Sequence, residues 1–175
     1  LLFSVPYRRR RIMAFLNPWA DRRGTGFQII QSFVALGSGG LFGLGLGASK
    51  QKLFFLPEPY TDFIFSIIAE EMGLIGVTVI LFAFVVFLWR GFSIADKSGE
   101  MFGRLLAAGI TSLIGIQALL NIGVVSGVLP TKGLPLPFVS YGGSSILFNL
   151  TGVGILLNIY SRTRNVDGRA ARANG

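Results

Sequence analysis

The sequence predicts an all-α membrane protein, a polytopic bundle of transmembrane helices with about four complete spans. Of the 175 residues, 51% are apolar and 14% are charged, whereas a soluble domain carries about 25% charged residues. The mean hydropathy is +0.64. The charges are bunched and leave four long stretches nearly free of them, and about 20 apolar residues are enough for a helix to cross a bilayer.

The composition also excludes several kinds of chemistry. The chain has no cysteine and no histidine, so disulfides, thiol catalysis, Cys/His zinc sites and Ser-His-Asp triads are excluded within it. The net charge is +8, but the basic residues cluster at the ends of the apolar stretches. That placement is typical of membrane topology and of contact with anionic phospholipids, and we expect no nucleic-acid partner.

Residues 1–26 are predicted to hold the end of a preceding span and a cytoplasmic amphipathic flank. Leu1–Pro6 is apolar but too short to span, and because no Met precedes it we expect the chain to be a fragment. The arginines of Arg8–Arg11 follow directly. The next apolar residues lie at helical spacing, on one face of a helix in the membrane surface; they are Ile12, Phe15, Leu16 and Trp19.

Residues 27–160 are predicted to form a four-helix transmembrane region with outer loops at 48–61 and 130–145. The predicted spans are 27–46, 63–89, 105–129 and a last one that ends near Tyr160. In the first span, Gly39, Gly43 and Gly47 are spaced to let another helix approach closely. Residues 161–175 are predicted to be a disordered cytoplasmic tail.

Four acids stand at or inside the second span, where charges are costly and often functional. Thr61 is a plausible N-cap, with Asp62 in the first turn and Glu58 in the loop before it. The helical period puts small and polar residues on one face that should meet the bundle: Asp62, Ser66, Ala69, Gly73 and Gly76. Bulky residues fill the face that should meet lipid: Phe63, Ile64, Ile67, Ile68, Leu74 and Ile75. Glu70 lies beside the polar face, whereas Glu71 falls nearly opposite, where only another helix would cover it.

The distribution of positive charge predicts the orientation in the membrane. Thirteen of the sixteen Lys and Arg residues lie at one set of span ends, and only Lys50, Lys52 and Lys132 lie at the other. The richly basic side is cytoplasmic by the positive-inside rule. Asp62, Glu58, the three lysines and the Ser140–Ser145 loop are therefore predicted to share the outer face.

These outer residues are suited to more than one activity. A carboxylate can take a proton from a sugar hydroxyl, and a lysine can neutralise a phosphate leaving group. The same parts could form a transport gate, with Asp62 binding a proton or cation, or serve only as a helix cap and a buried polar network. In the third span, Gln117 and Asn121 lie one turn apart, and such amides usually join helices by hydrogen bonds.

Two long motifs resemble the signatures of the SEDS family, the FtsW, RodA and SpoVE proteins of bacterial cell-wall synthesis. They read Leu56-Pro-Glu-Pro-Tyr-Thr-Asp-Phe-Ile-Phe-Ser-Ile-Ile-Ala-Glu-Glu-Met-Gly73 and Leu129-Pro-Thr-Lys-Gly-Leu-Pro-Leu-Pro-Phe-Val-Ser-Tyr-Gly-Gly-Ser-Ser145. Shorter matches are Asn17-Pro-Trp-Ala-Asp21, Gly26-Phe-Gln28 and Gln31-Ser32. The Pro-Thr-Lys-Gly sequence is most similar to the FtsW and SpoVE branch.

The resemblance implies a ten-helix fold, of which this chain would supply the last four helices and the end of the sixth. It implies a peptidoglycan glycosyltransferase that polymerises lipid II, with Asp62 in the place of the family's essential aspartate, acting as general base. Lys132 matches the outer-loop lysine, which would meet the pyrophosphate, and Glu58 matches an acidic loop position. Lys50, Lys52, Ser140 and Ser144 are further candidates for substrate binding. Tyr60 departs from the family's usual His, which leaves Asp62 unaffected.

The resemblance further implies a divalent cation, Mg or Mn, for which Asp62 is the candidate ligand. The implied partners are lipid II, undecaprenyl pyrophosphate, a class B penicillin-binding protein that performs transpeptidation, and other membrane proteins of the division machinery. The implied location is the bacterial cytoplasmic membrane at the division septum, and we expect this fragment to be inactive alone. A lipid II flippase and a non-enzymatic scaffold remain the alternatives.

Overall fold

The computed structural model is all-helical in the part of the chain that it describes, which comprises residues 15, 17–20, 25–48, 62–130 and 133–173. A 3-10 helix, η1 (Pro18–Ala20), precedes four α-helices: α2 (Thr25–Ser38), α4 (Ile64–Lys97), α5 (Met101–Val125) and α6 (Gly143–Ala173). The described residues contain no strand. The predicted fold class, an all-α membrane protein, is confirmed.

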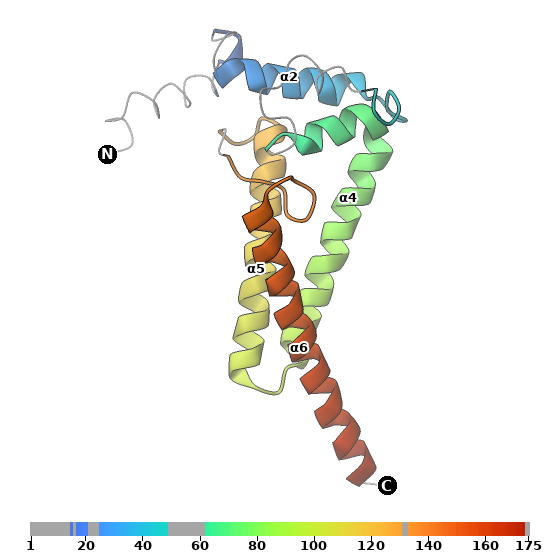
Figure 1. Cartoon of the computed structure of the whole chain (residues 1–175), viewed down its shortest axis with the longest axis vertical. Coiled ribbons are helices and arrows are strands. Elements are labelled where there is room, and N and C mark those ends of the chain that lie inside the picture. The colour runs from blue at the N-terminus through green and yellow to red at the C-terminus, as the bar shows by residue number, and fades with distance from the viewer. Residues whose placement is uncertain (1–14, 16, 21–24, 49–61, 131–132, 174–175) are drawn as a thin grey trace, which may run out of the picture.

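Three of the described helices are long and apolar enough to cross a membrane: α4, α5 and the segment Gly143–Arg164 of α6. In Figure 1, α4 and α5 form an antiparallel pair joined by a short turn, and both extend from that turn toward α2, with α6 lying against the pair. Glycines permit the close approach, because a Cβ on Gly91 would overlap the Thr111 side chain and one on Gly152 would lie 3.0 Å from Ile110 Cγ2. Small residues at such contacts are typical of membrane helix bundles.

The predicted first span, 27–46, is wrong in its second half. Helix α2 ends at Ser38, and residues 39–48 form a glycine loop. Gly40, Gly43, Gly45 and Gly47 have positive φ angles, which a right-handed helix of L-residues does not contain. The remaining helix is too short to count as a span, and Figure 1 shows it lying across one end of the bundle. Three described helices, not four, can therefore cross a membrane.

The predicted second span is one element in the sequence but two in space. Helix α4 is broken at Gly73, where φ is 64° and ψ is −158°. Figure 1 shows the segment before the break running beneath α2, and the long segment after it turning away along the bundle. Glycine is the residue that adopts such a conformation without steric cost.

The other predicted boundaries shift by several residues. Helix α4 continues past Trp89 to Lys97, and α5 starts at Met101, so the polar turn between them is shorter than predicted. Helix α6 continues past Tyr160 to Ala173, whereas a disordered tail was expected there. The alanines and arginines of this segment favour helix. Of the predicted amphipathic flank, Ile12 and Leu16 lie outside the described residues.

A compact core surrounds the end of the bundle at which α4 begins. Its buried members are Phe63, Phe65, Ile67, Ala118, Val125 and Leu136. They come from the start of α4, from α5 and from the loop before α6. Phe63 and Ile67 were predicted to face lipid, but they are 4% and 3% exposed, because the break lets α2, α5 and that loop enclose the first turns of α4. We call this the site end of the bundle.

Candidate functional site

Asp62 lies at the site end, directly before Phe63, the N-cap residue of α4. The N-cap position is Phe63, which makes no side-chain capping hydrogen bond, and the Ser66 hydroxyl donates to the Phe63 carbonyl at 2.7 Å. The helix therefore starts later than predicted: Thr61 lies outside the described residues, and Asp62 precedes the first turn. Asp62 is half-buried.

Residues 133–142 of the second motif form a loop that folds back into the bundle before α6, which we call the re-entrant loop. Leu136 and Pro137 are buried. The Leu136 amide donates to Ser140 Oγ at 2.7 Å, and the Ser140 amide donates to the Leu136 carbonyl at 3.0 Å. The Phe138 ring lies edge-on to Phe87 of α4, with 5.8 Å between ring centroids. Irregular backbone at membrane depth is tolerated where protein buries it and satisfies its polar groups.

The two motifs meet at Asp62 and Gly133. A Cβ built on Gly133 would lie 3.1 Å from Asp62 Oδ2, so the carboxylate lies against the backbone of the second motif. Lys132 directly precedes Gly133 in the sequence, although it lies outside the described residues. The structure thus brings together the predicted catalytic carboxylate and the loop that carries the predicted phosphate-binding lysine.

Two amides of α5 hold this junction together. Asn121 Nδ2 donates to the Asp62 carbonyl at 2.9 Å and to the Leu134 carbonyl at 2.6 Å. Gln117 Nε2, one turn away, donates to the Pro135 carbonyl at 3.0 Å. These residues were predicted to join helices. They do form structural hydrogen bonds, but with irregular backbone on either side of α5 and not with a neighbouring helix.

The helix break at Gly73 is a feature that the sequence reasoning missed. Backbone bonds cross between the broken helix and the glycine loop in both directions: Leu44 N to Glu70 O at 2.9 Å, Gly45 N to Glu71 O at 3.0 Å and Leu74 N to Gly40 O at 3.0 Å. The backbone groups freed by the break are therefore satisfied by the loop. The sequence signal for this contact was the series Gly39, Gly43 and Gly47. It predicted the close approach of another helix, and the structure shows close approach between the backbone of the glycine loop and the backbone of α4.

The same contact accounts for the environment of the two inner acids. Glu70 is 2% exposed and Glu71 is half-buried. A Cβ on Gly43 would collide with the Glu71 carbonyl oxygen, so the glycine loop lies directly on this part of α4. We expected another helix to cover Glu71. In the structure the glycine loop covers the backbone of Glu71 instead.

The other predicted substrate-binding residues differ in how they are placed. Ser140 is 2% exposed and its hydroxyl accepts the Leu136 amide, which gives it a structural role in the re-entrant loop. Ser144 is exposed in the first turn of α6. Lys50, Lys52, Glu58 and Lys132 lie outside the described residues. For all six, contact with substrate stays a prediction.

The described donor set suits a divalent cation that is shared with substrate. Among the residues that the structure describes, no three Asp, Glu, His or Cys side chains gather as a metal cage. Mg²⁺ is usually held by one or two carboxylates together with substrate phosphates and water. Asp62 fits that arrangement as the single described carboxylate at the junction of the motifs.

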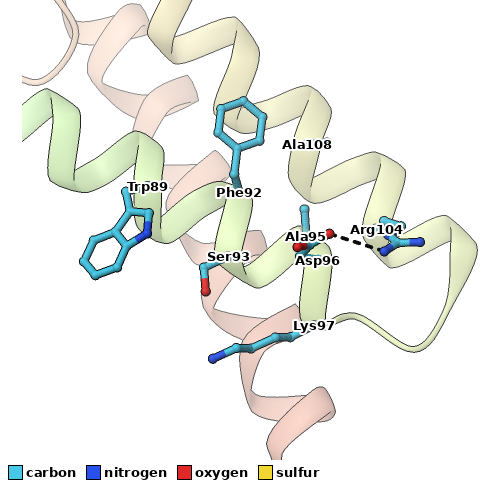
Figure 2. Close-up of a pocket in the computed structure, with 8 residues that line it drawn as sticks. All are labelled: Trp89, Phe92, Ser93, Ala95, Asp96, Lys97, Arg104 and Ala108. Carbon is cyan, nitrogen blue, oxygen red and sulfur yellow. Dashed lines mark hydrogen bonds and ion pairs between the residues drawn. The ribbon is translucent and has the colours of Figure 1, made fainter.

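Two cavities of the described chain lie apart from Asp62. Figure 2 shows one of about 590 Å³ at the far end of α4, lined by residues that include Trp89, Phe92, Lys97 and Arg104. There Arg104 Nη2 lies 3.3 Å from Asp96 Oδ1. A second cavity, also about 590 Å³, lies between α5 and α6 and is largely apolar. Neither cavity is lined by Asp62 or Gly133.

Comparison with known sequences gives consistent matches. Residues 1–165 match the model of the FtsW, RodA and SpoVE family, described as cell cycle protein. The chain is 58% identical over 164 residues to a probable peptidoglycan glycosyltransferase FtsW of Geobacter metallireducens, covering 94% of this chain and 44% of that protein. It is 57% identical to the stage V sporulation protein E of Bacillus subtilis, covering 93% and 45%. The chain thus spans less than half the length of these relatives.

Solved structures give the same picture. A chain in a structure described as "Structural coordination of polymerization and crosslinking by a peptidoglycan synthase complex" matches with a TM-score of 0.70 and 31% identity, covering 91% of this chain and 43% of that one. A mutant of the rod shape determining protein RodA of Thermus thermophilus matches with a TM-score of 0.58 and 35% identity, covering 74% and 39%. Both support a helical membrane fold of this type.

Proposed function

Because the chain belongs to the FtsW, RodA and SpoVE family of cell cycle proteins, we propose that it is the C-terminal part of a peptidoglycan glycosyltransferase. The enzyme polymerises lipid II into glycan strands, with Asp62 as the general base. The observation that carries the proposal is the contact of the Asp62 carboxylate with Gly133. It joins the two motifs in one place, at the end of a membrane helix bundle where a lipid-linked sugar can arrive.

The proposed reaction is an inverting single displacement. Asp62 takes the proton of the 4-hydroxyl on the acceptor's GlcNAc. The oxygen attacks the anomeric carbon of the donor's MurNAc and forms the new glycosidic bond. The bond to undecaprenyl pyrophosphate breaks, and its electron pair leaves with the pyrophosphate. Asp62 suits this role because it precedes α4, half-buried, with its backbone fixed by Asn121.

The leaving group carries the charge that the site must stabilise. Lys132, next to Gly133 in the sequence, is the proposed contact for the pyrophosphate, since a fixed cation there stabilises developing negative charge. We assign Glu58, Lys50, Lys52, Ser140 and Ser144 to substrate binding on the resemblance alone. A divalent cation, held by Asp62 and the substrate phosphates, would supply further charge neutralisation.

The proposed partners follow from the relatives. One matched structure is described as a complex that coordinates polymerization and crosslinking, which supports a class B penicillin-binding protein as the crosslinking partner. The high identity to an FtsW and to the sporulation protein supports a place at a division septum. We propose that the chain sits in the bacterial cytoplasmic membrane with Asp62 outside and its C-terminal end in the cytoplasm.

The helix break favours a second candidate, a lipid II flippase. Broken helices line substrate paths in many transporters, and here α4 breaks close to the site end. A flippase must translocate lipid II across vesicle membranes in the absence of polymerisation. Loss of this translocation in the Asp62→Asn variant would support that candidate over the transferase.

A non-enzymatic scaffold is the remaining alternative. It predicts that cells with the Asp62→Asn variant divide normally.

The test of the transferase uses a full-length protein that carries this sequence, purified with its transpeptidase partner and supplied with lipid II. We compare the wild type with Asp62→Asn and, as matched control, Asp96→Asn. Asp96 is an exposed carboxylate at the opposite end of α4. We expect the Asp62 variant to fold and to bind the partner, but to make no glycan strands, and the control to retain activity. Strands of normal length and amount from Asp62→Asn would contradict the proposal.

A further inference from the structure

Asn121 touches both halves of the proposed site at once. Its Nδ2 group lies 2.9 Å from the Asp62 carbonyl oxygen and 2.6 Å from that of Leu134. These two carbonyls come from segments far apart in the chain, the entry to α4 and the re-entrant loop before α6. Asn121 is 1% exposed. A single buried side chain on α5 therefore spans the gap between the base and the second motif.

The chemistry of the amide fixes its orientation. Both neighbours are carbonyl oxygens, which only accept hydrogen bonds, so the NH₂ end must face them and the Oδ1 atom must face away. Oδ1 is buried and has no hydrogen-bond partner among the residues that the structure describes. A buried acceptor left in this way is uncommon. The orientation that leaves Oδ1 without a bond is the one in which Nδ2 donates to both the Asp62 and the Leu134 carbonyls.

We infer that Asn121 is a positioning residue for the transferase reaction. It holds the backbone of Asp62 at a fixed distance from the loop segment that contains Gly133 and Leu134. The carboxylate can then stay in reach of the acceptor hydroxyl while the loop meets the leaving group. This inference rests on the proposed function for its effect on rate, but the tether itself is independent of activity. Small displacements of a reacting group lower rates steeply.

Gln117 supplies a matched comparison within the same helix. It is also an amide that bonds a carbonyl of the re-entrant loop, Pro135 O, at 3.0 Å, and no bond joins it to Asp62. Replacing either residue with Leu removes an amide donor from α5 and leaves an apolar side chain of similar size in its place. Of the two changes, only that of Asn121 removes a hydrogen bond to Asp62. A difference between the two variants therefore measures positioning of the base and not general loosening of the loop.

The first experiment measures steady-state lipid II polymerisation by the full-length protein with its partner. For Asn121→Leu we expect kcat to fall about tenfold or more with KM changed by less than about twofold, because the base is displaced while substrate contacts remain. For Gln117→Leu we expect kcat to fall by less than about threefold. Equal losses in the two variants, or an unchanged kcat in Asn121→Leu, would overturn the inference.

The second experiment measures the tether without activity and serves if Asn121→Leu folds poorly. Asn121→Asp keeps the shape and Oδ1 but replaces the donor with an acceptor. Hydrogen exchange of the loop amides should rise in this variant, notably at Leu136, Val139 and Ser140, whose amides are bonded within the loop. Exchange in the middle of α5 should stay unchanged. Unaltered loop exchange would overturn the tether, whereas full polymerisation by Asp62→Asn would overturn the proposed function alone.

Discussion

The carboxylate of Asp62 lies against the backbone of Gly133, so that a side chain on this residue would fit only if the carboxylate moved. A Cβ at this glycine would lie 3.1 Å from Asp62 Oδ2 and 3.9 Å from Asp62 Cγ. Contacts this close force a neighbour to move by a few tenths of an ångström. Because Asp62 belongs to the first motif and Gly133 to the second, this contact makes them a single site.

Gly133→Ala should lower activity without unfolding the protein. The added methyl group would displace the Asp62 carboxylate, and we expect kcat to fall about three- to tenfold, since a 1 Å misplacement can cost about a hundredfold. The measurement is lipid II polymerisation together with the melting temperature. Gly142→Ala is the control in the same loop, because its Cβ would meet only Ser145 at 3.6 Å. Equal activity in both variants would argue against a site at Gly133.

Gly73→Ala should destabilise the protein. The residue has a φ of 64°, and its Cβ would collide with the backbone of Gly43 and Leu41. The conformation alone costs a side-chain-bearing residue about 1–3 kcal/mol. Thermal unfolding in detergent should show a lower melting temperature. Gly109→Ala, at an open position in α5, should leave it unchanged or raise it; a loss as large as that of Gly73→Ala would show that the break is not special.

Gly91→Ala should weaken the contact of α4 with α5. A Cβ there would overlap the Thr111 side chain, which is fully buried and already bonded to the Ala107 carbonyl at 2.7 Å. Overpacking of this kind costs about 1–3 kcal/mol. The double variant Gly91→Ala, Thr111→Ala should recover part of the loss in melting temperature, because the two residues share the same space. Strictly additive losses would contradict this packing.

Removal of the Arg104–Asp96 pair should change little. Both side chains are more than half exposed, at 56% and 85%, and their atoms are 3.3 Å apart. Exposed pairs of this kind contribute about 0–1 kcal/mol. The melting temperature of Asp96→Asn should therefore stay within a few degrees of the wild type. A large drop would mean that this end of the bundle, shown in Figure 2, depends on the ion pair.

The sequence alone was enough to predict the membrane class and the approximate positions of α4, α5 and α6. The role of Asp62 at the centre of the site stays a prediction. Charge-free stretches report spans directly, because a charge inside a bilayer is costly whatever the tertiary structure. The amides Gln117 and Asn121 were predicted to have a structural role because amides in an apolar helix need hydrogen-bond partners. Their partners, however, are carbonyls of irregular backbone, whose position no periodic pattern reveals.

The break at Gly73 could not be predicted from the helical period. Apolar residues continue on both sides of it, and an isolated glycine inside a helical pattern does not by itself predict a break. What decides the break is the glycine loop at 39–48, whose amides replace the missing helical bonds at Glu70 and Glu71. That exchange is a tertiary contact between residues about 30 positions apart. Phe63 and Ile67 were assigned to lipid because the covering loop was unknown.

The central claim is that the carboxylate of Asp62 performs the chemistry at the junction of the two motifs. The most direct measurement is the initial rate of glycan formation from purified lipid II by the full-length protein and its partner, with Asp62 replaced by Asn. The account predicts a loss of at least about a hundredfold, the usual contribution of a general base, with folding and partner binding retained. A rate within about twofold of the wild type would contradict it.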